Sequence, residues 1–303
     1  MTSQPSDGAA RNAAATHLWF AAMPGVFVLL WSTGWLGAKY GLPFAEPFSY
    51  LAYRFSIAAV LLALFALATG AVWPKDARQF VNAVLVGMLL HGVYLGGVFW
   101  SIAQGFPVGV SALINGLQPV LTAMLARPYL GERLNTRQWL GIMLGFSGVT
   151  LVVWHKIGPL DGQMAGAAAN VIGMIGITMA TLYQKRHGGT ADLRSGAAIQ
   201  LASAACLMWI IALAVERLEV TWTGTFIAVM AWMVLVNSLG AFSLLYILIR
   251  RGAASKVASL FYLVPPVVAL EAWLLFGETM SPTAIAGMAM TALGVALVTR
   301  GTQ

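Results

Sequence analysis

The sequence predicts an all-α integral membrane protein in which ten transmembrane helices form two inverted five-helix repeats. Three observations predict this fold class. Hydrophobic residues make up 59% of the chain and charged residues only 9%, against roughly 25% charged residues in soluble domains. The hydrophobic residues form ten runs of membrane-spanning length, and the second half of the chain repeats the first at a constant offset of 146 residues.

The ten runs are close to the ~20 residues that a helix needs to cross the hydrocarbon core. They also lack the polar alternation that is typical of strands in a membrane barrel. The expected spans are 18–38, 48–69, 80–103, 107–126, 137–155, 164–184, 195–215, 224–249, 255–275 and 282–299. Residues 1–16 are small and polar and are expected to form a disordered cytoplasmic tail. The first repeat then covers 17–157 and the second covers 158–303.

The internal repeat is clearest at glycines, prolines and acids. Positions that recur after 146 residues include Pro119, Gly131, Glu132, Gly141 and Gly148, which return as Pro265, Gly277, Glu278, Gly287 and Gly294. Each repeat holds five spans, an odd number, so the second repeat enters the membrane from the opposite side. Inverted repeats place a site between them near the midplane and suit alternating access. The pattern therefore indicates a transporter.

The charges give the orientation of the chain. With the N-terminus inside, thirteen of the 17 Lys and Arg residues fall on the cytoplasmic side, Lys39, Lys156 and Arg217 fall outside, and Arg54 lies within a span. This is the positive-inside asymmetry of membrane proteins. It accounts for the net charge of +7 without a nucleic-acid partner. We expect a multi-pass protein of the bacterial inner (plasma) membrane with both termini in the cytoplasm.

Small residues and prolines mark how the spans pack. Gly141, Gly145 and Gly148 share one face of a span, and Gly287 and Gly294 repeat this face. Such residues let helices approach closely in lipid, either within a monomer, which we favour, or at the seam of a weak homodimer. Mid-span prolines at 119 and 265–266 indicate either static kinks or backbone carbonyls freed to line a cavity. Cys206 lies within a span and is expected to be a buried free thiol.

Two motifs resemble a known family. They are Trp31-Ser32-Thr33-Gly34 in the first span and the hairpin Leu130-Gly131-Glu132-Arg133-Leu134, echoed by Phe276-Gly277-Glu278. Both are similar to the EamA-domain proteins of the drug/metabolite transporter (DMT) superfamily, over about residues 18–299. The resemblance implies ten helices in a five-plus-five arrangement around a central cavity. Within the family the chain looks most similar to YddG-type exporters of amino acids, although Thr178 departs from the pattern.

Polar side chains inside lipid are costly, so each one is a functional candidate. Ser111, Asn115, Gln118 and Thr122 follow helical spacing and share one face. This stripe predicts cavity lining, with hydrogen bonding between helices as the alternative.

The other candidate ligands lie in four further spans. His91 and Tyr94 share a face, and His91 is either a substrate ligand or gate, a packing residue or a proton site. The remaining candidates for substrate binding are Asn237, Tyr262, Ser32 and Trp35. Arg54 and Glu271 are at similar depth near the outer ends of two spans, and we expect an ion pair or an outer gate there.

The charge pattern also bounds the substrate. No Lys or Arg is expected at mid-span, where a phosphorylated substrate would need a cationic clamp. A zwitterion needs only dipoles and one donor-acceptor set, so amino acids, including aromatic ones, fit best as small-molecule substrates for export. The alternative is proton-coupled export of cationic drugs, for which Glu271 is the available acid. The spacing of His, Cys and acidic residues indicates no metal site, cofactor or catalytic set, so an enzyme is not expected.

Overall fold

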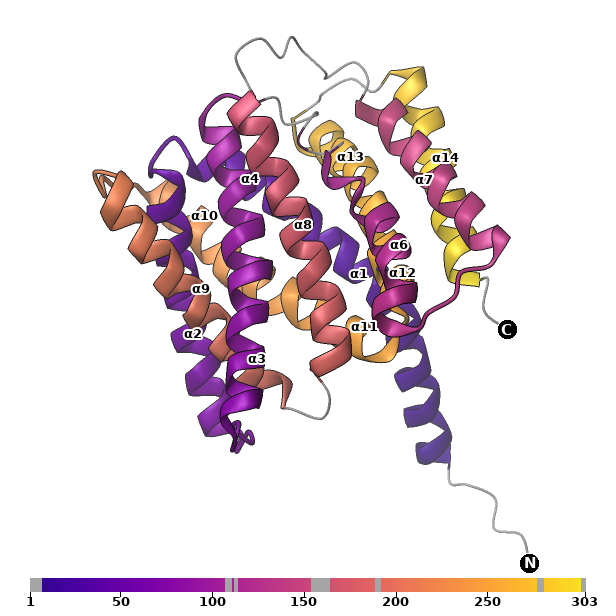
Figure 1. Ribbon diagram of the computed structural model, residues 1–303, viewed down its shortest axis with the longest axis horizontal. Coiled ribbons are helices and arrows are strands. Elements are labelled where there is room, and N and C mark those ends of the chain that lie inside the picture. Colours follow the sequence, from indigo (N-terminus) through magenta and orange to yellow (C-terminus); the bar gives the residue numbers. More distant parts are fainter. Residues whose placement is uncertain are drawn as a thin grey trace, which may run out of the picture.

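The computed structural model describes residues 7–106, 111, 114–153, 164–188, 192–276 and 281–300. Within these ranges it describes side chains from residue 22 onward, except at 153, 272, 275, 276 and 300. Within these ranges the regular structure is helical, and a single isolated bridge joins Ala45 to Val220. The helices run roughly side by side in one bundle (Figure 1). The expected all-α class is confirmed for this part of the chain.

Several expected spans consist of two or three helical segments that follow one another directly. The first half contains α1 (Asp7–Gly41), α2 (Pro47–Ala68), α3 (Ala77–Gly87), the π-helical η1 (Met88–Val93), α4 (Tyr94–Ala103), α6 (Gln118–Leu130) and α7 (Thr136–Val153). The second half contains α8 (Met164–His187), α9 (Leu193–Val215), α10 (Gly224–Trp232), the π-helical η3 (Met233–Ala241), α11 (Phe242–Arg251), α12 (Ala254–Ser259), the 3₁₀ segment η4 (Leu260–Leu263), α13 (Val264–Phe276) and α14 (Pro282–Arg300).

Seven helical stretches of the described residues are long and apolar enough to cross a membrane. They are Pro47–Ala68, Ala77–Ala103, Met164–His187, Leu193–Val215, Gly224–Arg251, Ala254–Glu271 and Pro282–Thr299, and each coincides with an expected span. The expected span 18–38 lies within α1. Of the expected span 137–155, residues 137–153 lie within α7, and the last two are outside the described residues. The span 107–126 includes residues outside the described part.

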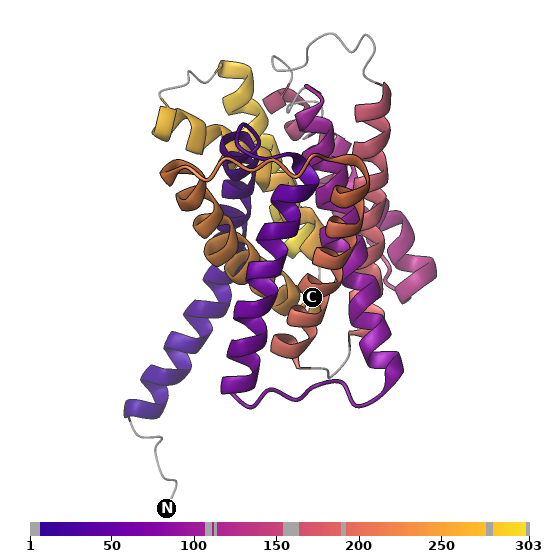
Figure 2. The ribbon, with the colours of Figure 1, turned by 90° about the vertical axis from the view of Figure 1, so that its left-hand side faces the viewer.

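The N-terminal tail differs from the expectation. Helix α1 begins at Asp7, so residues 7–16 are helical and the prediction of disorder is wrong for them. The reason is the alanine content of Ala9–Ala15, since alanine has the highest intrinsic helix propensity. A span that follows without a break also supplies the costly helix nucleus. Figure 2 shows this part of α1 extending beyond the other helices.

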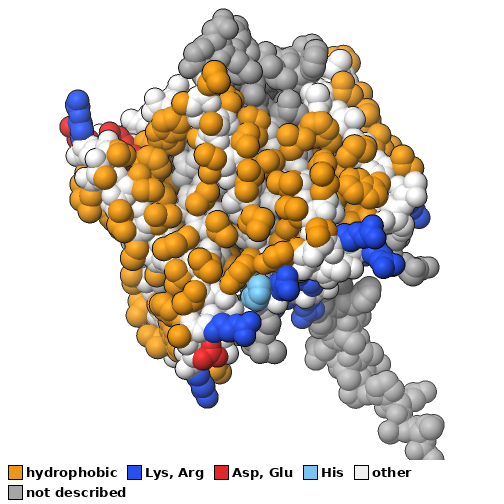
Figure 3. Space-filling view, in the orientation of Figure 1, with side chains coloured by type: hydrophobic (Ala, Val, Ile, Leu, Met, Phe, Trp, Pro, Cys, Tyr) orange, Lys and Arg blue, Asp and Glu red, His pale blue; other side chains and the backbone are white. Residues whose placement is uncertain are grey.

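The outer surface of the bundle is apolar. Leu64, Ile210 and Leu293 are 57–66% exposed, and in Figure 3 hydrophobic side chains cover the side of the molecule while charged side chains gather towards its ends. Exposed apolar surface on this scale requires lipid as the solvent, so this is a multi-pass membrane protein. Cys206 is a free thiol, as expected, but it is exposed on this surface rather than buried, because α9 packs on α2 and α3 through its other face.

The long-range contacts recur with the two halves exchanged. Helix α7 packs along α14, and α2 packs along α9 (Figure 1). A Cβ built on Gly141 would lie 2.6 Å from the carbonyl oxygen of Gly294, and one built on Gly287 would lie 2.6 Å from that of Gly148. Gly287 is the repeat counterpart of Gly141, and Gly294 is that of Gly148, because 146 residues separate each pair. The two contacts are therefore the same contact with the halves exchanged.

The loops repeat the same relation. The Leu218 backbone N–H donates to the Glu46 carboxylate (3.1 Å), and the Val72 N–H donates to the Asp192 carboxylate (3.1 Å). Residues 46 and 192 are 146 apart, as are residues 72 and 218. The same hydrogen bond therefore occurs twice. In each case the acid belongs to one half of the chain and the N–H donor to the other.

The breaks in the helices fall at corresponding positions as well. The π-helical segments η1 and η3 interrupt the α-helical geometry of their spans around His91 and Asn237. Helices α6 and α13 both begin one residue before a proline, at Gln118 and Val264. Pro119 therefore stands at a helix start, where its missing N–H is tolerated. Pro265 lies within the helical stretch Ala254–Glu271, at the change from the 3₁₀ segment η4 to α13.

The hairpin acid of the first half has a structural role. Glu132 accepts hydrogen bonds from the backbone N–H groups of Ala254 (2.9 Å) and Ser255 (3.5 Å), which begin α12. Its carboxylate thereby caps a helix N-terminus, where anions are favoured. The repeat positions Gly277 and Glu278 lie outside the described residues.

The close contact of α7 with α14 leaves no room for a side chain at its glycines. We expect Gly287→Ala to lower the melting temperature of the detergent-purified protein, since forcing a methyl group into a packed site costs about 1–3 kcal/mol. Gly25→Ala is the matched control, because no atom lies within 4 Å of the place that a Cβ would take there. Equal melting temperatures for both variants would contradict the tight contact.

Candidate functional site

Two pockets lie among the described helices. The first, here the aromatic pocket, has a volume of about 30 Å³ and is lined by Trp31, Gly34, Trp35, Ala38, Arg54, Tyr94, Leu95, Val98, Phe99, Asn237 and Phe242. It lies between α1, α2 and α4 of the first half and η3–α11 of the second half. Both halves of the chain therefore build its walls.

The walls of the aromatic pocket are centred on Trp31. Its ring centroid is 4.7 Å from that of Phe242 in an edge-on arrangement and 6.5 Å from that of Tyr94 in a stacked one. Phe261 closes the far side of the indole at 5.1 Å. Contacts of this kind favour offset and edge-to-face geometry, and they give the pocket a rigid, apolar wall.

A buried cation forms the polar side of the pocket. Arg54 is 1% exposed; its Nε donates to Ser238 Oγ (2.9 Å) and its Nη2 donates to Asn237 Oδ1 (2.8 Å). Asn237 is itself oriented, because its Nδ2 donates to the Leu30 carbonyl (3.1 Å). A Cβ at Gly34 would lie 2.9 Å from this Nδ2, so the glycine of the Trp31–Gly34 motif makes room for Asn237.

The expected ion pair between Arg54 and Glu271 is not formed. Arg54 uses the neutral acceptors of η3, while Glu271 has one carboxylate oxygen, Oε2, that is buried without a hydrogen-bond partner. The expectation of no mid-span cation is also wrong. The long side chain of Arg54 extends from α2 into the bundle and places its guanidinium beside Asn237, which is the repeat counterpart of His91.

Three of the predicted substrate ligands line the aromatic pocket: Trp35, Tyr94 and Asn237. Ser32 and His91 are fully buried beside it without lining it. The Ser32 hydroxyl donates to the carbonyl of Val28 in its own helix (2.7 Å). His91 Nε2 is hydrogen-bonded to the Tyr246 hydroxyl (2.7 Å), and its Nδ1 has no partner.

The predicted polar stripe is divided between two structural roles. Ser111 and Asn115 both donate to Asn170 Oδ1 of α8 (2.5 and 3.2 Å), whereas Gln118 Nε2 donates to Thr122 Oγ1 (3.1 Å). The bonds to Asn170 are the interhelical alternative to cavity lining. Neither described pocket includes the four stripe residues.

Tyr262 also takes a packing position. A Cβ on Gly145 of α7 would lie 2.6 Å from the Tyr262 ring, and the hydroxyl of this tyrosine is buried without a partner. The predicted substrate contact is therefore absent from both described pockets.

Sequence reasoning did not select Trp31, Phe99, Phe242 or Asn170 as ligands or polar partners. Trp31 stands out only as part of a motif, and Phe99 and Phe242 look like ordinary apolar residues of a span. These three side chains form one wall only because several helices meet there. Asn170 had a usable signal, because it is the single asparagine within 164–184, and a lone amide in a span needs a partner.

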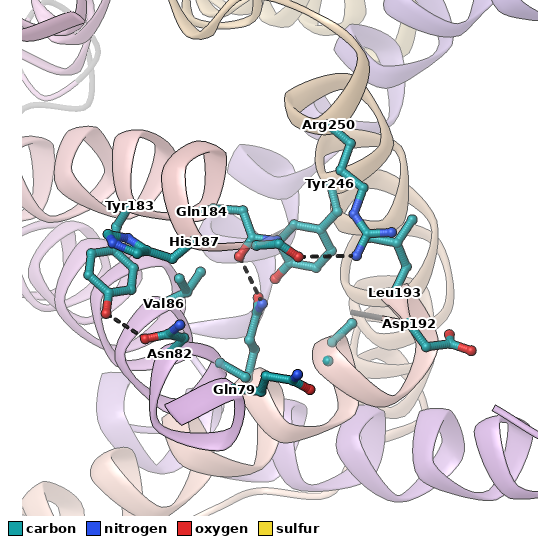
Figure 4. Close-up of a pocket in the computed structure, with 15 residues that line it drawn as sticks. Gln79, Asn82, Val86, Tyr183, Gln184, His187, Asp192, Leu193, Tyr246 and Arg250 are labelled. Atoms are coloured by element: carbon teal, nitrogen blue, oxygen red, sulfur yellow. Dashed lines mark hydrogen bonds between the residues drawn. The ribbon is translucent and has the colours of Figure 1, made fainter. Parts of the chain in front are cut away.

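The second pocket, here the polar pocket, has a volume of about 40 Å³ and lies where α3, α8, α9 and α11 meet (Figure 4). Tyr183 Oη donates to Asn82 Oδ1 (2.7 Å), and Gln200 Nε2 donates to Gln184 Oε1 (3.3 Å). Residues 200 and 184 follow 54 and 38 of the aromatic pocket by 146 residues. The two pockets thus share positions of the repeat, and a glutamine replaces the arginine.

Asp192 borders the polar pocket at the start of α9. The Arg194 side chain donates to its carboxylate at 2.7 and 3.1 Å, and backbone N–H groups of Arg194 and Val72 add two more bonds. These donors, led by the Arg194 side chain, hold the pKa of Asp192 well below its usual range. The carboxylate is therefore charged at neutral pH and ties α9 to the end of α2.

Comparison with known proteins shows where such an arrangement occurs. The profile of the EamA-like transporter family matches residues 20–154 and again residues 164–300. The uncharacterised inner membrane transporter YedA of Escherichia coli (strain K12) is 27% identical over 282 residues, 93% of this chain and 90% of YedA. A probable terminal-alkyne amino-acid exporter of Streptantibioticus cattleyicolor is 26% identical over 278 residues, 91% of each chain.

A solved crystal structure shares the fold. Its TM-score is 0.78 at 20% sequence identity, and the match covers 91% of this chain and 95% of the other. The likeness supports the helix arrangement and carries no statement about the substrate.

The low pKa of Asp192 links its contacts to pH. A depressed carboxylate pKa stabilises the fold above the unfolded pKa of about 4 and loses that contribution as the pH falls further. We expect Asp192→Asn to lower the melting temperature at pH 7, and the gap from the unchanged protein to narrow below about pH 4. A gap that is constant across this range would show that the charge plays no part.

Proposed function

The chain belongs to the EamA-like transporter family, and from this premise we propose that it exports neutral amino acids, aromatic ones among them, by alternating access. The observation that carries the proposal is the aromatic pocket, in which Trp31 and Tyr94 of one half face Asn237 of the other. An apolar wall with a few fixed polar groups suits a small amphipathic ligand. A relative named as a probable amino-acid exporter supports the same class.

We further propose ten spans in two inverted five-helix repeats within a bacterial inner membrane, with both termini cytoplasmic. Support comes from the glycine and acid contacts that recur with the halves exchanged, such as Glu46 with Leu218 and Asp192 with Val72. The two family matches cover the same two halves. The protein then works as a monomer or weak homodimer, because its glycine faces at α7 and α14 are used against each other.

The pockets support a mechanism of alternating access. Each has a volume of only 30–40 Å³, while sites for small molecules span roughly 300–1,000 Å³, so neither is large enough to hold an amino acid in this state. They share two positions of the repeat, 38 with 184 and 54 with 200. Rocking one half against the other opens one pocket as it closes its counterpart. The substrate then passes between the π-helical segments η1 and η3.

Inverted repeats predict opposite exposure of two corresponding helix starts. With Cys206→Ser as background, we expect Asn135→Cys and Ser281→Cys to react with a membrane-impermeant maleimide from opposite faces, residue 135 from the cytoplasm. These two residues precede α7 and α14. Labelling of both from the same face would overturn the inverted arrangement and the mechanism that depends on it.

Transport itself is tested by efflux from proteoliposomes with a panel of amino acids and cationic dyes. We expect phenylalanine and tryptophan to move down their own gradients without a proton gradient, because the fully buried His91 is held by Tyr246 and neighbouring aromatic rings and offers no exchangeable water contact. Empty liposomes give the background. Flux that vanishes when the proton gradient is collapsed would exclude facilitated movement.

Proton-coupled export of cationic drugs is the second candidate function, and Glu271 favours it. Its Oε2 is buried without a partner, as a proton-carrying acid in a transport pathway would be. In the same liposomes, a Glu271→Gln variant that loses dye efflux and keeps amino-acid flux would establish this function. Loss of neither activity would remove Glu271 from the transport path.

A further inference from the structure

Within the part of the chain that the structure describes, no acidic side chain balances the charge on Arg54. Its two hydrogen-bond partners, Ser238 and Asn237, are neutral, and no carboxylate of the described residues forms an ion pair with it. An ionised group inside a membrane protein is costly unless it is paired. Because a guanidinium stays charged, the cost cannot be avoided by losing the proton. A buried cation of this kind is stabilised by an anion that arrives from outside the fold.

The guanidinium is also held in one orientation. Arg54 Nη2 binds Asn237, Asn237 binds the Leu30 carbonyl, and Gly34 leaves space for the amide. The two hydrogen bonds to the protein use two of the five N–H donors of the fork. Planar guanidinium groups fixed in this way bind carboxylates bidentately. The residue is therefore built as a rigid receptor and not as a mobile surface charge.

The surroundings of Arg54 define the rest of the ligand. The aromatic pocket adds Trp31, Trp35 and Tyr94 to the cation, and it has no acidic lining residue. The corresponding position in the polar pocket is Gln200, which carries no charge. The polar pocket has a cation of its own, Arg250, but Asp192 also lines it. Of these two pockets, the aromatic pocket therefore combines a cation with apolar walls and no acidic residue. A cationic drug would meet repulsion there, whereas an anion with an aromatic body matches both features.

Building on the proposed function, we propose that Arg54 is the receptor for the carboxylate of the transported amino acid, and that this contact makes a free carboxylate a requirement for the aromatic pocket. A single guanidinium matches one carboxylate, since a phosphate group calls for further cations. The side chain of the substrate then lies against Trp31 and Tyr94.

The ligand-side test needs no substitution in the protein. Thermal stabilisation of the purified protein is measured with phenylalanine, 3-phenylpropionate, phenylalaninamide and phenethylamine, the last two lacking a carboxylate. We expect the first two to stabilise the protein and the last two to require at least about tenfold higher concentrations, as loss of a charge-assisted contact predicts. Equal stabilisation by all four, or stabilisation by none, would overturn the role of Arg54.

The protein-side test uses Arg54→Gln and Arg54→Lys. We expect Arg54→Gln to raise the half-saturation concentration for phenylalanine about tenfold or more and to remove the preference for phenylalanine over phenylalaninamide. Arg54→Lys keeps the charge without the fork and should retain part of the preference. Arg78→Gln, an exposed arginine in α3, is the matched control and should behave as the unchanged protein. An Arg54→Gln variant with an unchanged preference would overturn the proposal.

The outcomes separate this inference from the proposed function. Stabilisation by 3-phenylpropionate that depends on Arg54, with no amino-acid efflux from proteoliposomes, would leave a carboxylate site in a protein of different transport activity. Efflux of phenylalanine and its amide at equal rates would keep the exporter and overturn the receptor. If Arg54→Gln fails to give monodisperse protein, the four-ligand comparison on the unchanged protein decides the question.

Discussion

The absence of water inside the bilayer is the constraint from which this structure follows. Every polar group within the bundle must find its partner in the protein. Some bond to a carbonyl of their own helix, as Ser32 and Thr178 do, and others bond across elements distant in sequence. Asn170 collects donors from Ser111 and Asn115 and itself donates to Ser101 (2.6 Å). Glu216 accepts from the backbone N–H groups of Phe48 and Ser49 at the start of α2 (2.7 Å each). Polar contacts of this kind fix how helices align, because lipid offers them no substitute.

The same constraint explains why the two halves fit each other so closely. In lipid, helices associate through van der Waals contact and small residues rather than through the hydrophobic effect. Gly141, Gly148, Gly287 and Gly294 bring α7 and α14 to backbone contact. Each of these contacts recurs when the two halves are exchanged, so the same packing arrangement occurs twice in the protein. The two pockets of this fold share two positions of the repeat, 38 with 184 and 54 with 200.

The polar groups that remain without partners then mark positions of functional interest. Within the described part of the chain these include the unbalanced charge of Arg54, His91 Nδ1 and Glu271 Oε2. His91 and Asn237 occupy corresponding π-helical breaks, yet only Asn237 reaches a pocket. The repeat has therefore diverged at positions 54 and 200, and that divergence gives the aromatic pocket its cation and the polar pocket its glutamine.

The amino-acid sequence was sufficient to predict that the protein lies in lipid, that its spans are helical and that its second half repeats the first. Hydrophobic run length is a local property, and the 146-residue offset is visible in glycines, prolines and acids. Residue type and spacing also selected Trp35, Tyr94 and Asn237 for the pocket.

Which polar groups face each other, in contrast, depends on the packed bundle. Arg54 meets Asn237 and Ser238 rather than Glu271, and Ser111 and Asn115 bind Asn170. Helical periodicity gives the face of one helix and says nothing about the helix opposite. The reach of the arginine stem and the angle at which helices cross fix these partners, and both are set by packing across the whole bundle.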